Sequence, residues 1–145
     1  GQQTKSGVAP ESVGKGLIIS SDGLVLVRED IVSPADRMMV RSEGRLYPGK
    51  LIAENADLGI ALIKITGSFP TSAIDLRPAG REVRRATAME NGALLKNGQT
   101  LVGWSTGEGE KTSLRDIRSF AEENGSEIPK SDGDGPVEVE ILILR

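Results

Sequence analysis

The chain has 145 residues, a formal net charge of −3, no histidine and no cysteine. Lacking both residues, it cannot contain a Ser-His-Asp triad, a cysteine nucleophile, a disulfide or the usual Cys/His zinc sites, and we expect no metal or cofactor. Acidic and basic residues are interspersed, and no apolar run approaches the roughly 18 residues of a membrane span, so we expect neither nucleic-acid binding nor a membrane-spanning segment.

Short strands are predicted throughout the first half of the chain. Residues 1–13 are polar and lack periodicity, which predicts a flexible lead-in, and we expect no signal peptide within this sequence. Apolar segments separated mostly by Gly, Pro, Asn or Asp predict strands at 16–20, 24–27, 37–41, 45–53 and 60–66. We expect a sixth strand at 73–76, because six short strands at this spacing are typical of a small β-barrel.

One segment of this half carries a family resemblance. Apolar residues 24–27 are followed at once by Arg28-Glu29-Asp30 and then by Ile31-Val32. This segment resembles the first barrel of trypsin-like serine proteases of the HtrA/Deg family. Three flanking motifs extend the resemblance over about residues 14–67: Gly14-Lys15-Gly16, Gly44-Arg45-Leu46-Tyr47-Pro48-Gly49-Lys50 and Gly59-Ile60-Ala61-Leu62-Ile63-Lys64-Ile65.

The resemblance also implies that the catalytic residues of the family are missing. The position of the catalytic histidine falls on Asp30, and that of the catalytic aspartate falls on Gly59. The nucleophile loop is only faintly echoed at residues 131–136, where Gly133 stands in the serine position. We therefore expect no enzymatic activity, with Asp30 and Gly59 as degenerate positions of the site.

An unusual peptidase mechanism is the alternative from a different functional class. A serine can be activated by a desolvated lysine, such as Lys15 or Lys64, without any histidine. Nothing in the spacing of these lysines singles out a serine partner.

The second half of the chain predicts strand, helix and strand in that order. Residues 94–104 place a turn glycine before a buried strand, and Thr112 or Ser113 can cap a helix that ends at Gly125. Residues 136–144 then alternate apolar and acidic before becoming fully apolar. This order resembles a PDZ domain, with residues 136–144 as its last strand.

A PDZ-like module implies a loop that binds the terminal carboxylate of a peptide. Its best counterpart is residues 79–83, which contain Gly80 and Arg81, and Val83 would stand on the strand that a bound peptide extends. Four arginines near this loop either bind carboxylates or form a solvated face: Arg77, Arg81, Arg84 and Arg85.

The predicted helix supplies the other side of that groove. Ile117, Phe120 and Ala121 are the candidate peptide-binding residues on it, although helix residues at this spacing can equally belong to the core.

The expected architecture is mainly β with one or two helices. It comprises a lead-in over 1–13, a degenerate six-stranded trypsin-like half-barrel over 14–78 and a PDZ-like α/β module over 79–145. Each unit alone would be marginal at this size, so we expect the two to pack against each other.

The expected function is that of a non-catalytic HtrA-like pseudoprotease with a PDZ-like module. It would bind peptides or protein C-termini as an adaptor, chaperone or regulatory subunit, with possible homo-oligomerisation. The family resemblance implies an extracytoplasmic location, periplasmic or secreted. A structural assembly domain with an occluded groove is the third hypothesis, and an open or filled groove beside residues 113–121 would distinguish it from peptide binding.

Overall fold

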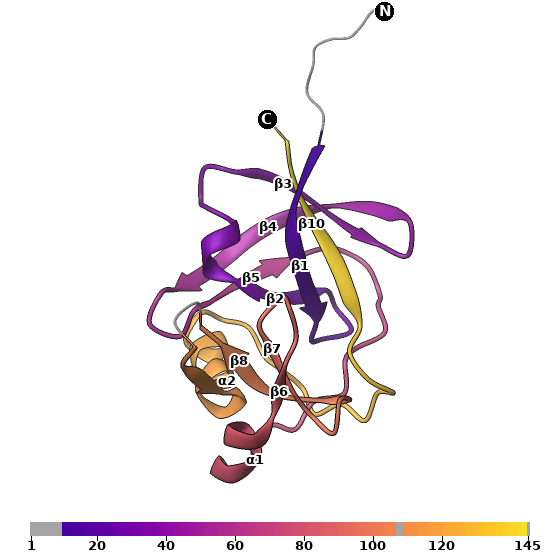
Figure 1. The fold of residues 1–145 in the computed structure, drawn as a ribbon. Coiled ribbons are helices and arrows are strands. Elements are labelled where there is room, and N and C mark those ends of the chain that lie inside the picture. Colours follow the sequence, from indigo (N-terminus) through magenta and orange to yellow (C-terminus); the bar gives the residue numbers. More distant parts are fainter. Residues whose placement is uncertain (1–9, 107–108, 145) are drawn as a thin grey trace, which may run out of the picture.

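The computed structural model describes residues 10–106 and 109–144, which form a β-barrel with a small sheet and two helices packed against it (Figure 1). The elements in chain order are β1 (Pro10–Ile18), β2 (Leu24–Arg28), the 3-10 turn η2 (Glu29–Ile31), β3 (Arg37–Ser42), β4 (Arg45–Asn55), β5 (Ile60–Lys64), α1 (Gly80–Arg85), β6 (Thr87–Ala88), β7 (Ala93–Lys96), β8 (Thr100–Ser105), β9 (Lys111–Ser113), α2 (Leu114–Glu123) and β10 (Glu138–Leu144). The predicted fold class is confirmed.

The barrel closes in the order β1-β10-β3-β4-β5-β2, and the small sheet has the order β6-β7-β8-β9. The first five strands predicted from the sequence correspond to β1 to β5. The predicted lead-in is wrong over residues 10–13, because β1 begins at Pro10 and pairs with β10 from that residue onward. Residues 1–9 lie outside the described part of the chain.

The sixth strand of the barrel comes from the end of the chain. Residues 73–76 do not form it, since only Ile74 pairs there, in isolated bridges to Leu101 and Ser131. Instead β10 lies between β1 and β3 and pairs antiparallel with both. The interpretation of residues 136–144 as the last strand of a PDZ-like module is therefore wrong.

The barrel strands are apolar on both faces because each face meets a different core. Along β2, Val25 and Val27 point into the barrel, whereas Leu24 and Leu26 point outward. A strand buried on both sides needs a continuous apolar run, which explains why this segment shows no polar alternation.

The outward faces of the barrel strands meet the second sheet and α2 in one shared core. Leu17, Leu26 and Leu62 from the barrel belong to the same buried cluster as Trp104 from β8 and Leu114 from α2. The expected packing of the two halves against each other is therefore present in the structure. The barrel also has an interior core of its own, whereas the second sheet and α2 bury most of their apolar residues in the shared cluster.

Helix α2 forms where the sequence predicts it. The hydroxyl of Ser113 accepts a hydrogen bond from the N–H of Arg115 at 3.1 Å and caps the first turn. Leu114, Ile117 and Ala121 lie on the face turned toward the shared core. Neither helix of the described part is long and apolar enough to cross a membrane.

Candidate functional site

The two positions that correspond to catalytic residues of the resembled family lie together. Asp30 belongs to η2, and Gly59 directly precedes β5. The N–H of Glu29 donates to the C=O of Gly59 at 3.2 Å, which joins the two segments. Asp30 and Gly59 line one cavity of about 540 Å³, together with Asp57 and residues from the end of β8 onward.

Asp30 is already engaged by a neighbour. Its Oδ2 lies 2.6 Å from Nη2 of Arg28, and its side chain is 51% exposed to solvent. A carboxylate in the catalytic position would need an imidazole or a nucleophile to act on, and the chain has no histidine. In this arrangement the aspartate forms a surface ion pair beside the cavity.

Gly59 cannot be replaced by a larger residue without moving the chain around it. Its φ of +74° lies in the left-handed region, which favours glycine. A Cβ at this position would lie 3.0 Å from Cγ2 and 3.2 Å from Cα of Thr106. The segment that follows β8 therefore occupies the space that an aspartate side chain would need.

The serine position of the nucleophile loop is not part of this cavity. Gly133 lies in the loop between α2 and β10, and a Cβ there would lie 2.5 Å from the C=O of Thr71. It lines cavities on another part of the surface, with residues such as Ser131. The loop closely approaches residues 71–73, and a glycine at position 133 is needed because a side chain there would collide with that backbone.

A scan against protein-family models found no match to this chain. The chain is similar to "Serine protease HTRA1" of Xenopus tropicalis, with 37% identity over 76 residues, covering 48% of this chain and 16% of that protein. It is similar to the "Probable periplasmic serine endoprotease DegP-like" proteins of Pseudomonas putida and Ectopseudomonas mendocina, each 40% identical over 63 residues, covering 42% of this chain and 13% of the relative. The chain thus spans about a sixth or less of the length of these relatives.

These similarities and the six-stranded barrel support an HtrA-like relationship.

A Ser-Lys arrangement does occur in the HtrA-like barrel, but an aspartate separates its members. Nζ of Lys64 lies 2.8 Å from Oδ2 of Asp22, and the hydroxyl of Ser20 donates to the other oxygen of the same carboxylate. The hydrogen bonds from Lys64 and Ser20 lower the pKa of Asp22. Ser20 is buried and also accepts from the N–H of Leu24 at 3.0 Å. The trio stabilises the β1–β2 turn.

Lys15, the other candidate lysine, is exposed on β1. The hydroxyl of Ser12, the serine of the same strand, is bonded to Glu140. This lysine is not desolvated, so it lacks the environment that a catalytic dyad requires.

The residues predicted for a carboxylate-binding loop form a helix instead. Gly80, Arg81 and Val83 all belong to α1. The prediction that Val83 stands on a strand open to a peptide is wrong, because its side chain is buried against Leu94 and Val102. The segment forms a short helix that packs on the second sheet through Val83.

The predicted groove residues on α2 are covered by protein. Ile117 and Ala121 are fully buried and Phe120 is 8% exposed, and all three belong to the shared core. The surface on which a peptide would have been placed against α2 is therefore filled. These three residues therefore belong to the core, which is the alternative that the sequence also allows.

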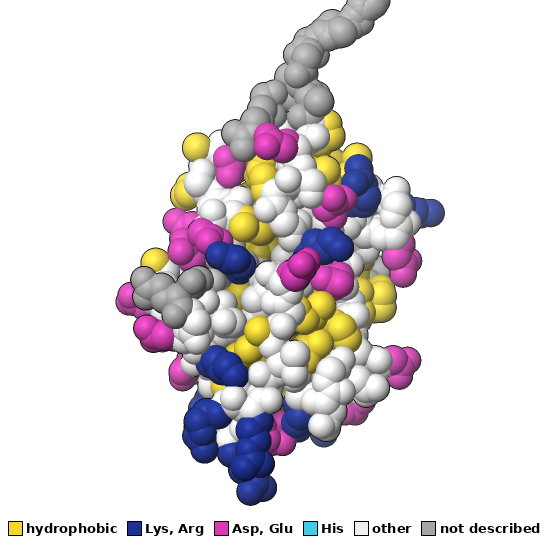
Figure 2. Space-filling model, viewed as in Figure 1, with side chains coloured by type: hydrophobic (Ala, Val, Ile, Leu, Met, Phe, Trp, Pro, Cys, Tyr) yellow, Lys and Arg dark blue, Asp and Glu magenta, His cyan; other side chains and the backbone are white. Residues whose placement is uncertain are grey.

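The arginines of the same region gather at one end of the molecule, where α1 lies (Figure 2). Arg77, Arg81, Arg84 and Arg85 are all exposed. Within the described residues, no carboxylate lies at ion-pair distance from Arg81, Arg84 or Arg85. Glu82, the acidic residue of α1, pairs with Lys96 at 3.1 Å instead.

Lys96 links α1 to the segment that follows the barrel. Its Nζ lies 3.0 Å from Oδ2 of Asp75 and 3.1 Å from Oε2 of Glu82. Burial raises the pKa of Asp75, but the hydrogen bonds from Lys96 and from the N–H of Arg77 outweigh it and lower the pKa overall. The N–H of Ala79 and the Lys96 ammonium lower the pKa of Glu82. The two carboxylates in turn raise the pKa of Lys96.

We expect Lys96→Met to weaken the fold at neutral pH but not in strong acid. A carboxyl whose pKa is lowered by folding stabilises the protein above its ordinary pKa, which is 3.8 for Asp75, and this stabilisation is lost as the pH falls through the folded value. Thermal unfolding between about pH 2 and pH 7 should show the two proteins converging at the acid end. Lys130→Met, at an exposed lysine outside the ion pairs of the described residues, is the control. A constant difference at all pH values would contradict the assignment.

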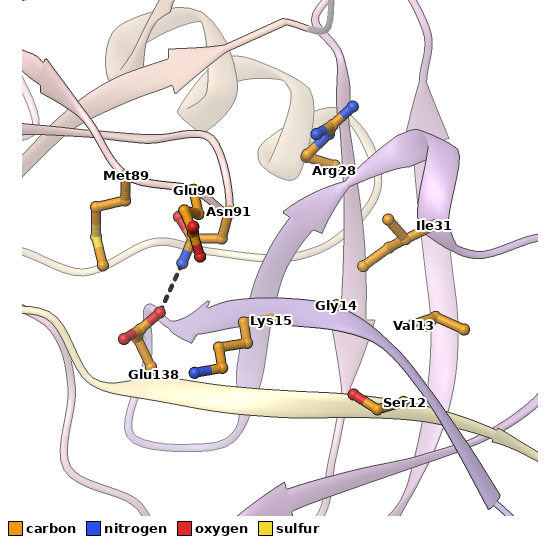
Figure 3. Close-up of a pocket in the computed structure, with 10 residues that line it drawn as sticks. All are labelled: Ser12, Val13, Gly14, Lys15, Arg28, Ile31, Met89, Glu90, Asn91 and Glu138. Carbon is orange, nitrogen blue, oxygen red and sulfur yellow. Dashed lines mark hydrogen bonds between the residues drawn. The ribbon is translucent and has the colours of Figure 1, made fainter.

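A second cavity, of about 560 Å³, was not predicted from the sequence (Figure 3). One wall is residues 12–15 of β1, and the opposite wall is Arg28 and Ile31. The turn at residues 89–91, which belongs to the second sheet, closes one end. The two glycines of this strand do not signal the cavity, because Gly14 and Gly16 accommodate the close approach of Ile31 and Val27 to β1.

Proposed function

We propose that this chain is a non-catalytic HtrA-like module that binds extended peptide segments or termini of partner proteins. The observation that carries the proposal is the state of the former active site. Asp30 stands in the histidine position and pairs with Arg28, while Gly59 stands in the aspartate position with Thr106 against it. The cavity beside these positions is lined by carboxylates and Arg28, and it contains no imidazole that could activate a serine in the manner of a triad.

A barrel that lacks the catalytic residues can still bind polypeptides, so we propose a role as an adaptor, chaperone or regulatory subunit. The relatives are named as proteases, and some as periplasmic, so the partners we propose are polypeptides met in an extracytoplasmic compartment. Recognition through a PDZ-like carboxylate loop is not part of the proposal, because α1 occupies that position.

A structural assembly domain is the second candidate function. The burial of Ile117, Phe120 and Ala121 favours it, because the expected peptide groove beside α2 is filled. In that case both halves serve as architecture, and copies of the chain or neighbouring subunits would be the partners. The concentration dependence of the molar mass in solution distinguishes this candidate from a monomeric peptide-binding module.

We expect the purified chain to hydrolyse neither unfolded casein nor fluorogenic peptides, and to resist labelling by a fluorophosphonate probe. A serine reacts with that probe only when a base activates it, and the chain has no histidine. An active HtrA-type protease treated in parallel serves as the positive control. Covalent labelling of any serine, with loss of labelling after Lys15→Ala or Lys64→Ala, would establish the unusual-peptidase alternative.

A further inference from the structure

Strands β1 and β2 of the barrel pair over only a short part of their length. Strand β1 pairs with β10 from Pro10 to Leu17, with a register shift between Ser12 and Gly14. Its ladder with β2 contains only two pairs, Leu17 with Leu26 and Ile18 with Val25. From Gly16 toward the start of the strand, β1 and β2 diverge, because β2 ends at Arg28 and the chain turns into η2. One edge of β1 is thus left without a strand partner.

The register of the ladder shows which backbone groups face this opening. The N–H of Ile18 donates to the C=O of Val137 on the β10 side at 3.0 Å, whereas the N–H of Ile19 donates to Leu24 at 2.8 Å. Donors and acceptors of successive residues point to opposite sides of a strand. The N–H and C=O of Lys15 therefore point away from β10, toward the gap beside Arg28.

The opening coincides with the cavity beside β1. Its volume of about 560 Å³ lies within the range of about 300–1,000 Å³ that is usual for ligand sites. Figure 3 shows Ile31 and Val13 toward one end and Met89 above the other, which gives apolar surface along the strand. Gly14 lies between them, and the Cβ that it lacks would lie 3.1 Å from Cδ1 of Ile31, so the side chain of Ile31 covers β1 at that point.

The wall formed by the 89–91 turn is held rigidly. Asn91 accepts from the N–H of Ala93 at 2.9 Å and donates from Nδ2 to Oε2 of Glu138 at 3.1 Å (Figure 3). The N–H of Gly92 donates to the C=O of Met89 at 3.0 Å. The turn is therefore tied both to its own sheet and to β10 of the barrel. The groove is present without rearrangement of its walls.

We propose that this groove binds an extended peptide segment of a partner protein, which adds to the free edge of β1 at Lys15 as a short strand. Only an extended backbone offers the complementary N–H and C=O groups for such an edge. Apolar side chains on alternate residues of the peptide then face Val13, Ile31 and Met89. This inference rests on the proposed binding function and gives it a location different from the α2 surface.

The test uses the full chain and a displayed library of random dodecapeptides, with affinities of the selected peptides measured by fluorescence anisotropy. Lys15→Pro removes the edge N–H but spares the ladder with β10, and it should weaken binding by roughly tenfold. Lys15→Ala keeps both backbone groups and should stay within about threefold of the wild type. The two variants change the same side chain, so their difference isolates the backbone edge.

A second measurement on the wild-type protein covers the case in which Lys15→Pro fails to fold. Selected peptides are resynthesised with single backbone N-methyl groups, which remove one donor at a time. Strand addition predicts loss of binding at alternate residues only. Selection of no peptide, equal binding by Lys15→Pro and wild type, or uniform tolerance of N-methylation overturns the inference. The hydrolysis assay tests the absence of catalysis separately. If peptides bind equally well to Lys15→Pro and to the wild type, the proposed binding function remains and only its location at β1 is wrong.

Discussion

A chain that ends before β10 should not form the barrel. Val139, Ile141 and Ile143 of β10 point into the barrel core, and all three are at most 3% exposed. Burial of each such side chain contributes about 1.5–3 kcal/mol, so their loss removes roughly 5–9 kcal/mol. Typical domains have about 5–15 kcal/mol of stability in total. Removal of β10 also leaves the edges of β1 and β3 unpaired.

Two fragments test this expectation. One contains residues 10–78, which is the half-barrel predicted over 14–78 extended to the start of β1, and the other ends at residue 135. Both should lack dispersed amide signals in NMR spectra, while the full chain shows them. A synthetic peptide of residues 136–145 should restore the dispersed spectrum of the longer fragment, and the same peptide with Ile141→Asp should not. A folded 10–78 fragment would show that the half-barrel is autonomous after all.

Trp104→Ala should destabilise both halves of the molecule together, by about 3–5 kcal/mol. Trp104 is fully buried in the core that the barrel shares with β8 and α2. Truncation to alanine leaves a cavity between the two parts, which cannot collapse without moving strands of the barrel. The chain has one tryptophan, so urea unfolding is followed by far-UV circular dichroism and not by fluorescence.

Trp104→Phe is the matched control. It retains most of the apolar volume and removes Nε1, which has no hydrogen-bond partner among the described residues. The loss should therefore be clearly smaller than for alanine. A single transition in all three proteins fits the shared core. Two separate transitions, one for each half, would contradict it.

The strands and the helix whose residues show a clear apolar periodicity or a cap could be predicted from the sequence. The apolar runs of β2 and β5, the turn glycines between strands and the Ser113 cap of α2 are decided by neighbours in the chain. The lack of an imidazole anywhere in the molecule also follows from residue types, because the chain has no histidine. Asp30 and Gly59 fall beside one cavity, as the family resemblance implies.

Segments whose pattern fits more than one partner could not be placed in this way. The alternation along β10 predicts a strand with one apolar face, but it does not say which sheet receives it. The pattern of residues 79–83 is typical of a loop and strand, whereas the helix α1 is set by packing of Val83 on Leu94 and Val102. The apolar face of α2 fits either a groove or a core, and it is buried because it covers the outer face of the barrel.

The sequence by itself determined the short barrel strands, one amphipathic helix and the lack of a histidine for a Ser-His-Asp triad, and it carries the resemblance to the first barrel of HtrA/Deg proteases. Tertiary structure alone decided that the last strand closes the barrel, that the helix face is core and that β1 keeps a free edge beside a groove. The physical reason is that local patterns specify conformation and the side of burial. The partner of each buried face and strand edge depends on contacts between residues far apart in the chain, such as Leu17 with Glu138.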